Sequence, residues 1–474
     1  MRHLHSAHAL ADGETLEVTS PYDDTPLATV TVAAGAAIEK ALHTASSLFL
    51  DRKQWLPQPQ RIAILERAAT LMAERAESLA RDAAAEGGKP LIDSRVEVAR
   101  AIDGIRICIE TLRTAAGEVI PMEVNPASAG RLAFTQHEPI GVVVAVSAFN
   151  HPLNLIVHQV GPAIAAGCPV IVKPARTTPI SCFNMVEILR EAGLPEGWCQ
   201  PLVIRDSALS TALVADARVG FLSFIGSARV GWMLRSKLAP GARCALEHGG
   251  SAPVLVAEDA NMASAIPKLV KGGFYHAGQV CVSVQRIFAH TTIAHDLASA
   301  IATAAKKQVI GNPLAEETEI GPLIQPAELQ RVDSWVQEAI DDGAERLAGG
   351  EALSHSCYQA TVLYNPPPTC RLSQQEVFGP VVTVTPYTEL EEAVAAANSL
   401  PFAFQAAIFT NSINRALNTY RTLDASAVMV NDHTAFRVDW MPFAGLRHSG
   451  LGVGGIPHTL HDMQVAKMMV LNPG

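Results

Sequence analysis

Between residues 140 and 224 the chain alternates strand patterns with helical ones, and this alternation restricts the possible folds more than any other feature. Residues 140–146 form an apolar, largely β-branched run, which is typical of a strand buried on both faces. Shorter strand patterns follow at 170–173, 200–204 and 220–224, each after a helical stretch. Strands that alternate with helices form parallel, doubly wound sheets. The sequence therefore predicts an α/β fold with a doubly wound, nucleotide-binding sheet.

A second alternation begins after residue 250 and predicts a further α/β unit. Its strand patterns lie at 253–256, 286–289 and 381–384, and a glycine-rich stretch at 444–455 precedes a last strand at 467–471. A chain of 474 residues is too long for one ordinary core and favours two or three domains. The amino-terminal block, with two short strands in 15–32 and helices at 36–49, 60–84 and 91–116, is interpreted as scaffold.

Charge and composition argue against several classes of partner. The net charge is −10 and no basic block is present, so we expect neither a nucleic acid nor an anionic membrane as partner. The longest apolar run is far shorter than the roughly 20 residues that span a bilayer, and the first ten residues contain no apolar signal segment. The eight cysteines are scattered, with no Cys-x-x-Cys pair. This pattern predicts free thiols, no metal site and a cytoplasmic location.

One cysteine stands out by its setting. Cys281 ends the glycine-punctuated stretch Gly278-Gln279-Val280-Cys281, and Glu247 lies 34 positions upstream. A thiol that becomes a thiolate and a carboxylate that accepts a proton form a minimal pair for covalent catalysis. Taken alone, the cysteine fits equally well as a small buried hydrophobe, which is the usual role of a free thiol.

Other candidate residues follow the predicted strands, where doubly wound sheets bind ligands. Lys173 ends one strand, and Asn150 follows the most buried strand with an amide that can donate to an oxyanion. Gly226 and Ser227 begin a turn that ends at Gly231 and opens a helix, a geometry that suits a pyrophosphate. Each has a structural alternative, namely a solvated strand end, a turn asparagine and a packing turn.

Seven motifs resemble those of the aldehyde dehydrogenase superfamily and occur in the family's order. They are Phe149-Asn150-His151-Pro152, Lys173-Pro174-Ala175, Phe224-Ile225-Gly226-Ser227, Glu247-His248-Gly249-Gly250, Gly278-Gln279-Val280-Cys281, Glu376-Val377-Phe378-Gly379-Pro380 and Pro442-Phe443-Ala444-Gly445 with Ser449-Gly450. The resemblance extends over essentially the whole chain, and the spacing from the glutamate to the cysteine is also the family's.

The resemblance implies that the protein oxidises an aldehyde to a carboxylic acid with NAD or NADP. Cys281 would attack the aldehyde carbon, and the Asn150 amide with the Cys281 N–H would hold the oxyanion of the thiohemiacetal. After hydride transfer to the nicotinamide, Glu247 would activate the water that hydrolyses the thioester. The residues implied for cofactor binding are Ser147, Phe149, Lys173, Ala175, Arg176, Gly226, Ser227, Gly231, His248, Glu376 and Phe378.

The resemblance also implies a division into three parts. An NAD(P)-binding domain would comprise residues 1–118 and 140–248, and a catalytic domain residues 249–451. A small β oligomerisation arm would comprise residues 119–139 and 452–474. Because the edge strand of such an arm pairs with another subunit, we expect a homodimer or a homotetramer.

Three positions depart from the family pattern. Phe149 replaces the common tryptophan, and His248 replaces a leucine and adds an imidazole without an assigned role. Arg176 stands where many NAD-preferring members carry a glutamate that repels a 2′-phosphate. An arginine removes this repulsion and can pair with the phosphate through two hydrogen bonds. We therefore expect NADP to be accepted, with a solvent-facing arginine as the alternative.

The substrate is constrained by three further residues. Arg100, His158 and Arg437 lie where relatives that act on short polar or anionic aldehydes, lactaldehyde-like or phosphonoacetaldehyde-like, place similar residues. Together they would recognise a carboxylate, phosphonate or sulfonate. Val280 departs from the phosphonate-specific relatives, which carry an arginine directly before the cysteine. We expect a small polar or anionic aldehyde, unless one or more of the three residues is structural.

Other activities remain open on these residues. In a CoA-acylating aldehyde dehydrogenase CoA takes the acyl group, but such relatives often lack the glutamate that Glu247 supplies here. A cysteine hydrolase without redox chemistry would leave the motifs around Lys173 and Glu376 unexplained. A catalytically silent binding protein of the same fold would have no reason to keep both Cys281 and Glu247.

Overall fold

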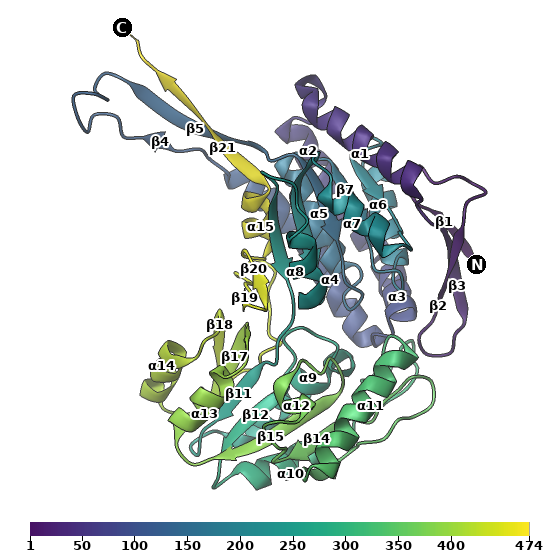
Figure 1. The fold of residues 1–474 in the computed structure, drawn as a ribbon, viewed down its shortest axis with the longest axis vertical. Coiled ribbons are helices and arrows are strands. Elements are labelled where there is room, and N and C mark those ends of the chain that lie inside the picture. Colours follow the sequence, from purple (N-terminus) through teal and green to yellow (C-terminus); the bar gives the residue numbers. More distant parts are fainter. Residues whose placement is uncertain (474) are drawn as a thin grey trace.

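The first domain is built on a mainly parallel sheet. Its first strand in sequence lies in the interior of the sheet, and later strands are added on both sides of it. The computed structural model describes residues 1–473, and Figure 1 shows this domain as its upper half. The strands lie in the order β20-β10-β9-β6-β7-β8, and β20 is the only antiparallel member. Their bounds are β6 (Val142–Val146), β7 (Val170–Lys173), β8 (Cys199–Pro201), β9 (Val219–Ile225), β10 (Arg243–Glu247) and β20 (Gly450–Leu451). The doubly wound sheet predicted from the alternation is confirmed.

Helices cover both faces of this sheet. Val143 and Ala145 face one core and Val142 and Val144 the other, which explains the uninterrupted apolar run of β6. The first core includes α2 (Gln58–Glu74), α3 (Ala76–Gly87), α4 (Leu91–Thr114), α5 (Asn154–Ala166), α6 (Ile180–Glu191) and α15 (Ile456–Asp462). The second includes α1 (Gly35–Leu50), α7 (Ser207–Ala215) and α8 (Ala228–Arg235). The single helix predicted at 60–84 is two, because the backbone leaves the α-helical region at Arg75.

The second domain, the lower half of Figure 1, has a seven-stranded sheet in the order β13-β14-β15-β12-β11-β17-β18. The strands are β11 (Pro253–Val256), β12 (Arg286–His290), β13 (Glu345–Ala348), β14 (Thr361–Tyr364), β15 (Val381–Tyr387), β17 (Gln405–Phe409) and β18 (Ala427–Val430). The helices are α9 (Met262–Phe274), α10 (Ala294–Ala305), α11 (Pro326–Asp341), α12 (Arg371–Gln374), α13 (Leu390–Asn398) and α14 (Ile413–Thr422). Only β13 runs antiparallel to its neighbour.

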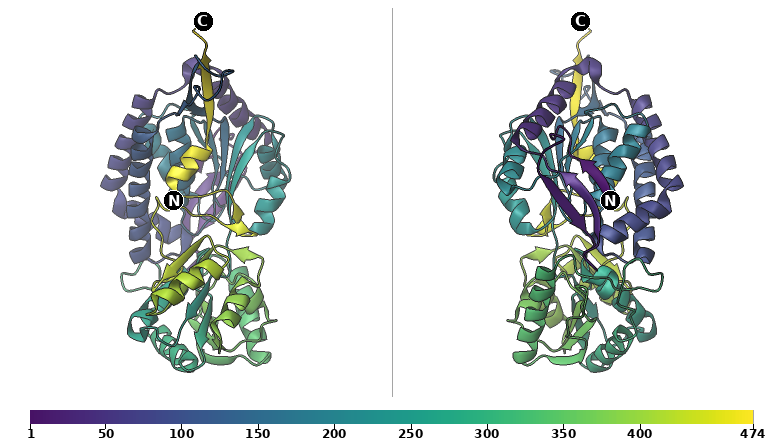
Figure 2. Two further views of the ribbon diagram at one scale, coloured as in Figure 1. Left: turned by 90° about the vertical axis from the view of Figure 1, so that its left-hand side faces the viewer. Right: turned by 90° about the vertical axis from the view of Figure 1, so that its right-hand side faces the viewer.

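Smaller sheets complete the chain. The arm consists of β4 (Val119–Ile120), β5 (Leu132–Pro139) and β21 (Gln464–Leu471). It projects from the first domain in Figure 1, and in the views of Figure 2 it overlaps that domain, with the carboxyl terminus at the top. An amino-terminal sheet joins β1 (Arg2–His5), which the sequence did not predict, to β2 (Thr15–Thr19) and β3 (Pro26–Thr31). A short pair links β16 (Phe402–Ala403) to β19 (Leu446–Arg447).

Helix α15 differs from the sequence-based division of the chain. Residues 452–474 were assigned to the arm, but α15 packs on α4 and α5 of the first domain. The reason is that Ile456 and Leu460 are buried in the core between these helices. From this segment, only β21 joins the arm. None of the helices within residues 1–473 combines the length and the apolar character needed to cross a membrane.

Where the two domains meet, the carboxyl ends of the strands of the first sheet face the amino ends of the strands of the second sheet. The first domain contributes the loops that follow β6, β7, β9 and β10, at the carboxyl ends of its strands. The second contributes the loops that lead into β12 and β15, at the amino ends of its strands. These loops line a common cavity between the domains.

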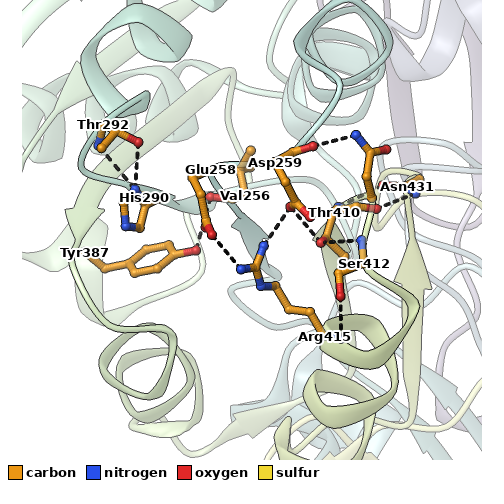
Figure 3. Close-up of polar contacts among 11 residues, drawn as sticks. Val256, Glu258, Asp259, His290, Thr292, Tyr387, Thr410, Ser412, Arg415 and Asn431 are labelled. Carbon is orange, nitrogen blue, oxygen red and sulfur yellow. Dashed lines mark hydrogen bonds and ion pairs between the residues drawn. The ribbon is translucent and has the colours of Figure 1, made fainter.

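The opposite end of the second sheet is closed by polar contacts, which Figure 3 shows. Arg415 of α14 donates to Glu258 at 2.6 Å and to Asp259 at 2.7 Å, just after β11. Thr410, just after β17, donates to the same Asp259 at 2.8 Å. Helix α14 is thereby tied to the carboxyl ends of two neighbouring strands.

Candidate active site

The cavity between the domains has a volume of about 720 Å³ and brings together residues from distant parts of the chain. Cys281, Glu247 and Asn150, which the sequence proposed as catalytic, all line its wall. Arg100 and Arg437 also line it, and His158 lies directly behind Arg437. Cofactor-site candidates on the wall are Ser147, Phe149, Ala175, Gly226, Ser227, His248, Glu376 and Phe378.

A tight turn carries Cys281 into the cavity. Three successive residues, His276, Ala277 and Gly278, have left-handed backbone angles with φ of 49°, 54° and 68°. A Cβ on Gly278 would lie 2.0 Å from the carbonyl oxygen of Gly379, so only glycine fits there. The Gln279 side chain fixes the loop from behind, because its Oε1 accepts from the backbone N–H of Ile324 at 3.0 Å.

The Cys281 thiol is held in its protonated form. Its pKa is raised to about 12, mainly by burial; Arg437 lowers it, and the carboxylates of Glu376 and Glu247 contribute to the increase. A thiol with such a pKa is a poor nucleophile at neutral pH unless a base takes its proton. The arrangement therefore requires a proton acceptor beside the sulfur.

Glu247 is the carboxylate at the end of β10 that can fill this role. Burial raises the pKa of Glu247, and Arg437 lowers it. A Cβ on Gly454 would lie 2.2 Å from Glu247 Oε1, so the carboxylate rests against the backbone of the glycine-rich stretch. Position 454 therefore requires a glycine, which gives a steric reason for one of the glycines in the stretch 444–455.

Asn150 connects the first sheet to the cysteine loop. It follows β6, and its Nδ2 donates to the backbone carbonyl of Gln279 at 2.9 Å. An amide nitrogen carries two hydrogens, so one hydrogen positions the side chain while the other is free to donate into the cavity. This geometry suits a donor to a developing oxyanion near Cys281.

Two glycines allow the cofactor-side residues to approach the backbone. A Cβ on Gly231 would lie 2.0 Å from His248 Nε2, and one on Gly249 would lie 1.7 Å from Glu376 Oε1. His248 Nδ1 donates to the carbonyl of His448 at 2.9 Å, and burial lowers the pKa of His248. The imidazole is therefore neutral, with its Nε2 lone pair facing α8.

Several polar atoms on this side of the cavity lack a partner. Within residues 1–473, Ser147 Oγ, His248 Nε2 and Glu376 Oε1 are buried without a hydrogen bond. The first N–H groups of α8 are also unsatisfied by the helix itself, as at every helix start, and Gly226 and Ser227 before them line the cavity. Hydroxyls and a pyrophosphate would satisfy these groups, so the residues present fit a nicotinamide dinucleotide.

Three cofactor candidates, Lys173, Arg176 and Gly231, are not among the described residues that line the cavity. Burial lowers the pKa of Lys173, at the end of β7, to about 8. Arg176 is exposed, and its Nη1 donates to the carbonyl of Arg205 at 3.2 Å. The rings of Phe149 and Phe378 meet edge-on with centroids 5.9 Å apart.

Asp439, which the sequence analysis did not propose, organises the other end of the cavity. This buried carboxylate accepts two hydrogen bonds from Arg100, at 2.6 and 3.0 Å, and one from His158 Nε2 at 2.7 Å. Burial alone would raise the pKa of Asp439, but the bonds from His158 and Arg100 lower it. Two of the three predicted substrate residues are thus bound to Asp439. The only sequence signal was a carboxylate two positions after Arg437.

Arg437 differs from Arg100 because no carboxylate among residues 1–473 forms an ion pair with it. Its Nη2 donates to His158 Nδ1 at 3.4 Å, its guanidinium stacks 3.5 Å above the Phe443 ring, and its Nε has no partner within the described chain. Burial lowers the pKa of Arg437. Burial and Arg437 also lower the pKa of His158, to about 4, so this histidine is neutral.

The charges at this end of the cavity leave an excess of one cation. Arg100 and Asp439 pair with each other and His158 is neutral, so none of the three supplies a counterion to the Arg437 guanidinium. Glu247 attracts it, but in residues 1–473 no carboxylate oxygen lies within the 4.0 Å of an ion pair with it. Buried guanidinium groups normally have such a partner.

Comparison with known proteins gives concordant results. A sequence profile of the Aldehyde dehydrogenase family matches residues 8–469. A 3-sulfolactaldehyde dehydrogenase from Priestia aryabhattai is 37% identical over 459 residues, which cover 97% of this chain and 95% of that protein. The crystal structure of aldehyde dehydrogenase 21 from Physcomitrella patens, in complex with the reaction product succinate, has a TM-score of 0.95 and 32% identity and covers 100% and 99% of the two chains. A glyceraldehyde-3-phosphate dehydrogenase from Methanocaldococcus jannaschii complexed with NADP has a TM-score of 0.93 and 33% identity and covers 98% and 100%.

Proposed function

The chain belongs to the aldehyde dehydrogenase family, and from this premise we propose that its substrate is a short aldehyde that carries one negative charge. The protein is an NAD(P)-dependent aldehyde dehydrogenase that oxidises its substrate to the carboxylic acid. The predictions of family, fold class, reaction and cofactor class are therefore confirmed. The alternatives of a hydrolase without redox chemistry and of a silent binding protein are wrong.

The observation that carries the proposal is the unneutralised guanidinium of Arg437. A carboxylate or sulfonate supplies the single negative charge that would balance it, whereas a phosphate monoester carries about −1.5 to −2 at neutral pH. Val280, next to the cysteine, adds no second cation. Three of the similar proteins support an anionic substrate, since sulfolactaldehyde, succinate and glyceraldehyde 3-phosphate all carry an anionic group. Lactaldehyde, which is named for a relative from Methanocaldococcus jannaschii, is polar but uncharged.

We assign the chemical steps to three residues on the cavity wall. The Cys281 thiol gives its proton to Glu247, and its sulfur bonds to the aldehyde carbon. The resulting oxyanion is held by the free Asn150 N–H and the backbone N–H of Cys281. Bound NAD or NADP supplies the hydride acceptor. Loss of the hydride leaves a thioester on Cys281, and Glu247 passes the thiol's proton to solvent. Glu247 then takes a proton from the water that attacks the thioester and returns it to the sulfur as the acid is released.

The cofactor half of the proposal rests on the unpartnered atoms near α8. Gly226, Ser227 and the start of α8 would hold the pyrophosphate, and Glu376 a ribose of the nicotinamide half. Lys173 would bind the adenosine ribose, and Arg176 a 2′-phosphate on it. The initial rates of wild type and Arg176→Glu with NADP and NAD test this part. We expect wild type to use NADP well and the variant to lose NADP activity at least tenfold; a hundredfold preference of wild type for NAD would contradict it.

A matched pair of aldehydes tests the anion site. 4-Oxobutanoate and its methyl ester share one carbon skeleton and differ in charge. We expect wild type to prefer the anion by roughly a hundredfold in kcat/KM, because a charged hydrogen bond contributes about 1.5–3 kcal/mol. Arg437→Met replaces the unbranched apolar part of the side chain without its charge, and it should remove this preference while sparing the ester. Equal kcat/KM values for both compounds in wild type would refute the proposal.

Assembly and location extend the same proposal. β21 is an edge strand of the arm, and its exposed residues include Met468, Met469, Val470 and Leu471, so a second copy of the chain is proposed to pair there. The eight cysteines are free thiols, which supports a reducing compartment such as the cytoplasm. Multi-angle light scattering should give the mass of a dimer or tetramer, and a monomer would contradict the assembly.

A further inference from the structure

Asn154, at the first position of α5, has an unused hydrogen-bond acceptor at the cavity. The residue lines the same cavity as Cys281 and Arg437, and its exposure is 3%. Its backbone N–H donates to Glu97 Oε1 at 3.0 Å, but its side-chain Oδ1 has no partner within residues 1–473. A buried amide oxygen without a donor is costly, so it needs an explanation.

The orientation of this amide is determined by its surroundings. Asn154 Nδ2 faces the Asp439 carboxylate at 3.4 Å. Since Arg100 and His158 keep Asp439 ionised, the carboxylate can only accept hydrogen bonds, and the nitrogen end of the amide must face it. Oδ1 therefore points away from Asp439 as an obligate acceptor.

Asn154 also lies between the two ends of the substrate site. Asn150, just before α5, bonds to the cysteine loop, and His158, one helical turn after Asn154, contacts Arg437. Asn154 and His158 lie on the same face of α5 and share Asp439 as partner. Along this wall the amide of Asn150, which can donate to an oxyanion, comes first. The unpartnered Asn154 Oδ1 follows, and the Arg437 guanidinium comes last.

We propose that Asn154 Oδ1 accepts a hydrogen bond from a substrate hydroxyl on a carbon between the aldehyde and the anionic group. The substrate class is then a short hydroxylated aldehyde with one negative charge, and Asn154 is the residue that distinguishes it from the deoxy compound. This inference rests on the proposed function for the position of the aldehyde. Neither an aldehyde carbon chain nor an anion can donate to Oδ1, whereas a hydroxyl can.

Two pairs of aldehydes measure the effect of the hydroxyl, one with an anion and one without. The first is 3-hydroxy-4-oxobutanoate and 4-oxobutanoate, and the second is lactaldehyde and propanal. In wild type we expect kcat/KM to be at least about tenfold higher for the hydroxylated member of each pair, because a site built to bond a hydroxyl disfavours the analogue that lacks it. In Asn154→Leu the ratio should fall to about one in both pairs.

A matched control separates recognition from folding. Gln159 is a buried amide on the same helix, and it donates to the carbonyls of Val146 and Ser223. Gln159→Met should keep the ratio of hydroxylated to deoxy substrate seen in wild type. If Asn154→Leu does not fold, competitive inhibition of wild type by the product acids decides instead, and we expect malate to bind at least about tenfold more tightly than succinate.

The outcomes distinguish this inference from the anion proposal. A lactaldehyde-to-propanal ratio that falls in Asn154→Leu supports the hydroxyl site even if wild type shows no preference for 4-oxobutanoate over its methyl ester. Ratios near one in wild type, a ratio unchanged in folded Asn154→Leu, or equal inhibition by malate and succinate would overturn it, and Oδ1 would then bind only water.

Discussion

Arg415 and Arg437 are two partly buried arginines of the same domain with opposite environments. Arg415 bonds to two carboxylates (Figure 3), and although burial alone would lower its pKa, Glu258 and Asp259 raise it above the ordinary value. Burial lowers the pKa of Arg437, and no such partner restores it. A buried cation without a counterion destabilises the fold, so such a group is expected where a ligand completes the pair.

The two arginines also lie at opposite ends of the second sheet. Parallel sheets of this kind bind ligands at the carboxyl ends of their strands, where the strand order reverses. In the second sheet this reversal lies between β11 and β17, and there Arg415 closes the crevice with ion pairs. The cavity instead opens at the amino ends, because these face the carboxyl ends of the first sheet across the domain boundary.

The largest effect should come from the base beside the thiol. Glu247→Gln keeps the shape of the side chain but cannot accept a proton, so we expect kcat to fall by roughly 10²–10⁴. Because burial raises the pKa of Glu247, wild-type activity should fall as the pH drops through a value above the ordinary 4.5. A pH profile of kcat would show this limb, and its persistence in Glu247→Gln would assign it to another group.

Asp439→Asn should remove the carboxylate that pairs with Arg100 and has no counterpart at Arg437 within residues 1–473. Arg100 would lose its partner, and because it is about a quarter exposed, we expect a loss of about 2 kcal/mol in the free energy of unfolding, less than for a fully buried pair. Urea unfolding measures this loss. Arg100 would also become a second free cation, so the preference should shift from 4-oxobutanoate towards glyceraldehyde 3-phosphate. No shift in this preference would mean that Arg100 does not contribute to the charge of the site.

Val280→Arg adds a cation directly before the cysteine in the chain without breaking a contact of Asp439. We expect kcat/KM for glyceraldehyde 3-phosphate, relative to 4-oxobutanoate, to rise by about tenfold, since a second guanidinium can share the phosphate. Val280→Met is an unbranched control without the charge, and it should leave the ratio unchanged. A ratio that stays constant in the arginine variant would argue that the substrate's anion does not reach this wall.

Arg415→Met should have the smallest effect, and on stability alone. Its ion pairs are partly exposed, so we expect a loss of about 1 kcal/mol in the free energy of unfolding. KM and kcat for 4-oxobutanoate should match those of wild type, whereas Arg437→Met should change KM without lowering the free energy of unfolding. Altered kinetics in Arg415→Met would show that the two ends of the sheet are coupled.

The sequence by itself determined the class of fold and the chemistry. The apolar run of β6 specifies a strand buried on both faces, and the glycines at 231, 249 and 278 mark backbone that must pass close to another group. Such local requirements are recorded in the residues themselves. Cys281, Glu247 and Asn150 were therefore identifiable as candidates before any contact was known.

Only the tertiary structure shows which of the two arginines, Arg100 or Arg437, lacks an ion-pair partner in the described part of the chain. Arg100 and Asp439 are 339 positions apart in the chain, and nothing local indicates that they pair. This contact gives one of the predicted substrate residues a partner, so that Arg100 is no longer a free cation. The same Asp439 also faces Asn154 Nδ2, which leaves the Asn154 oxygen pointing away from it. The break at Arg75 and the packing of α15 on the first domain are of the same kind. Pairings between distant segments depend on how the domains close, and neither periodicity nor motif spacing encodes that.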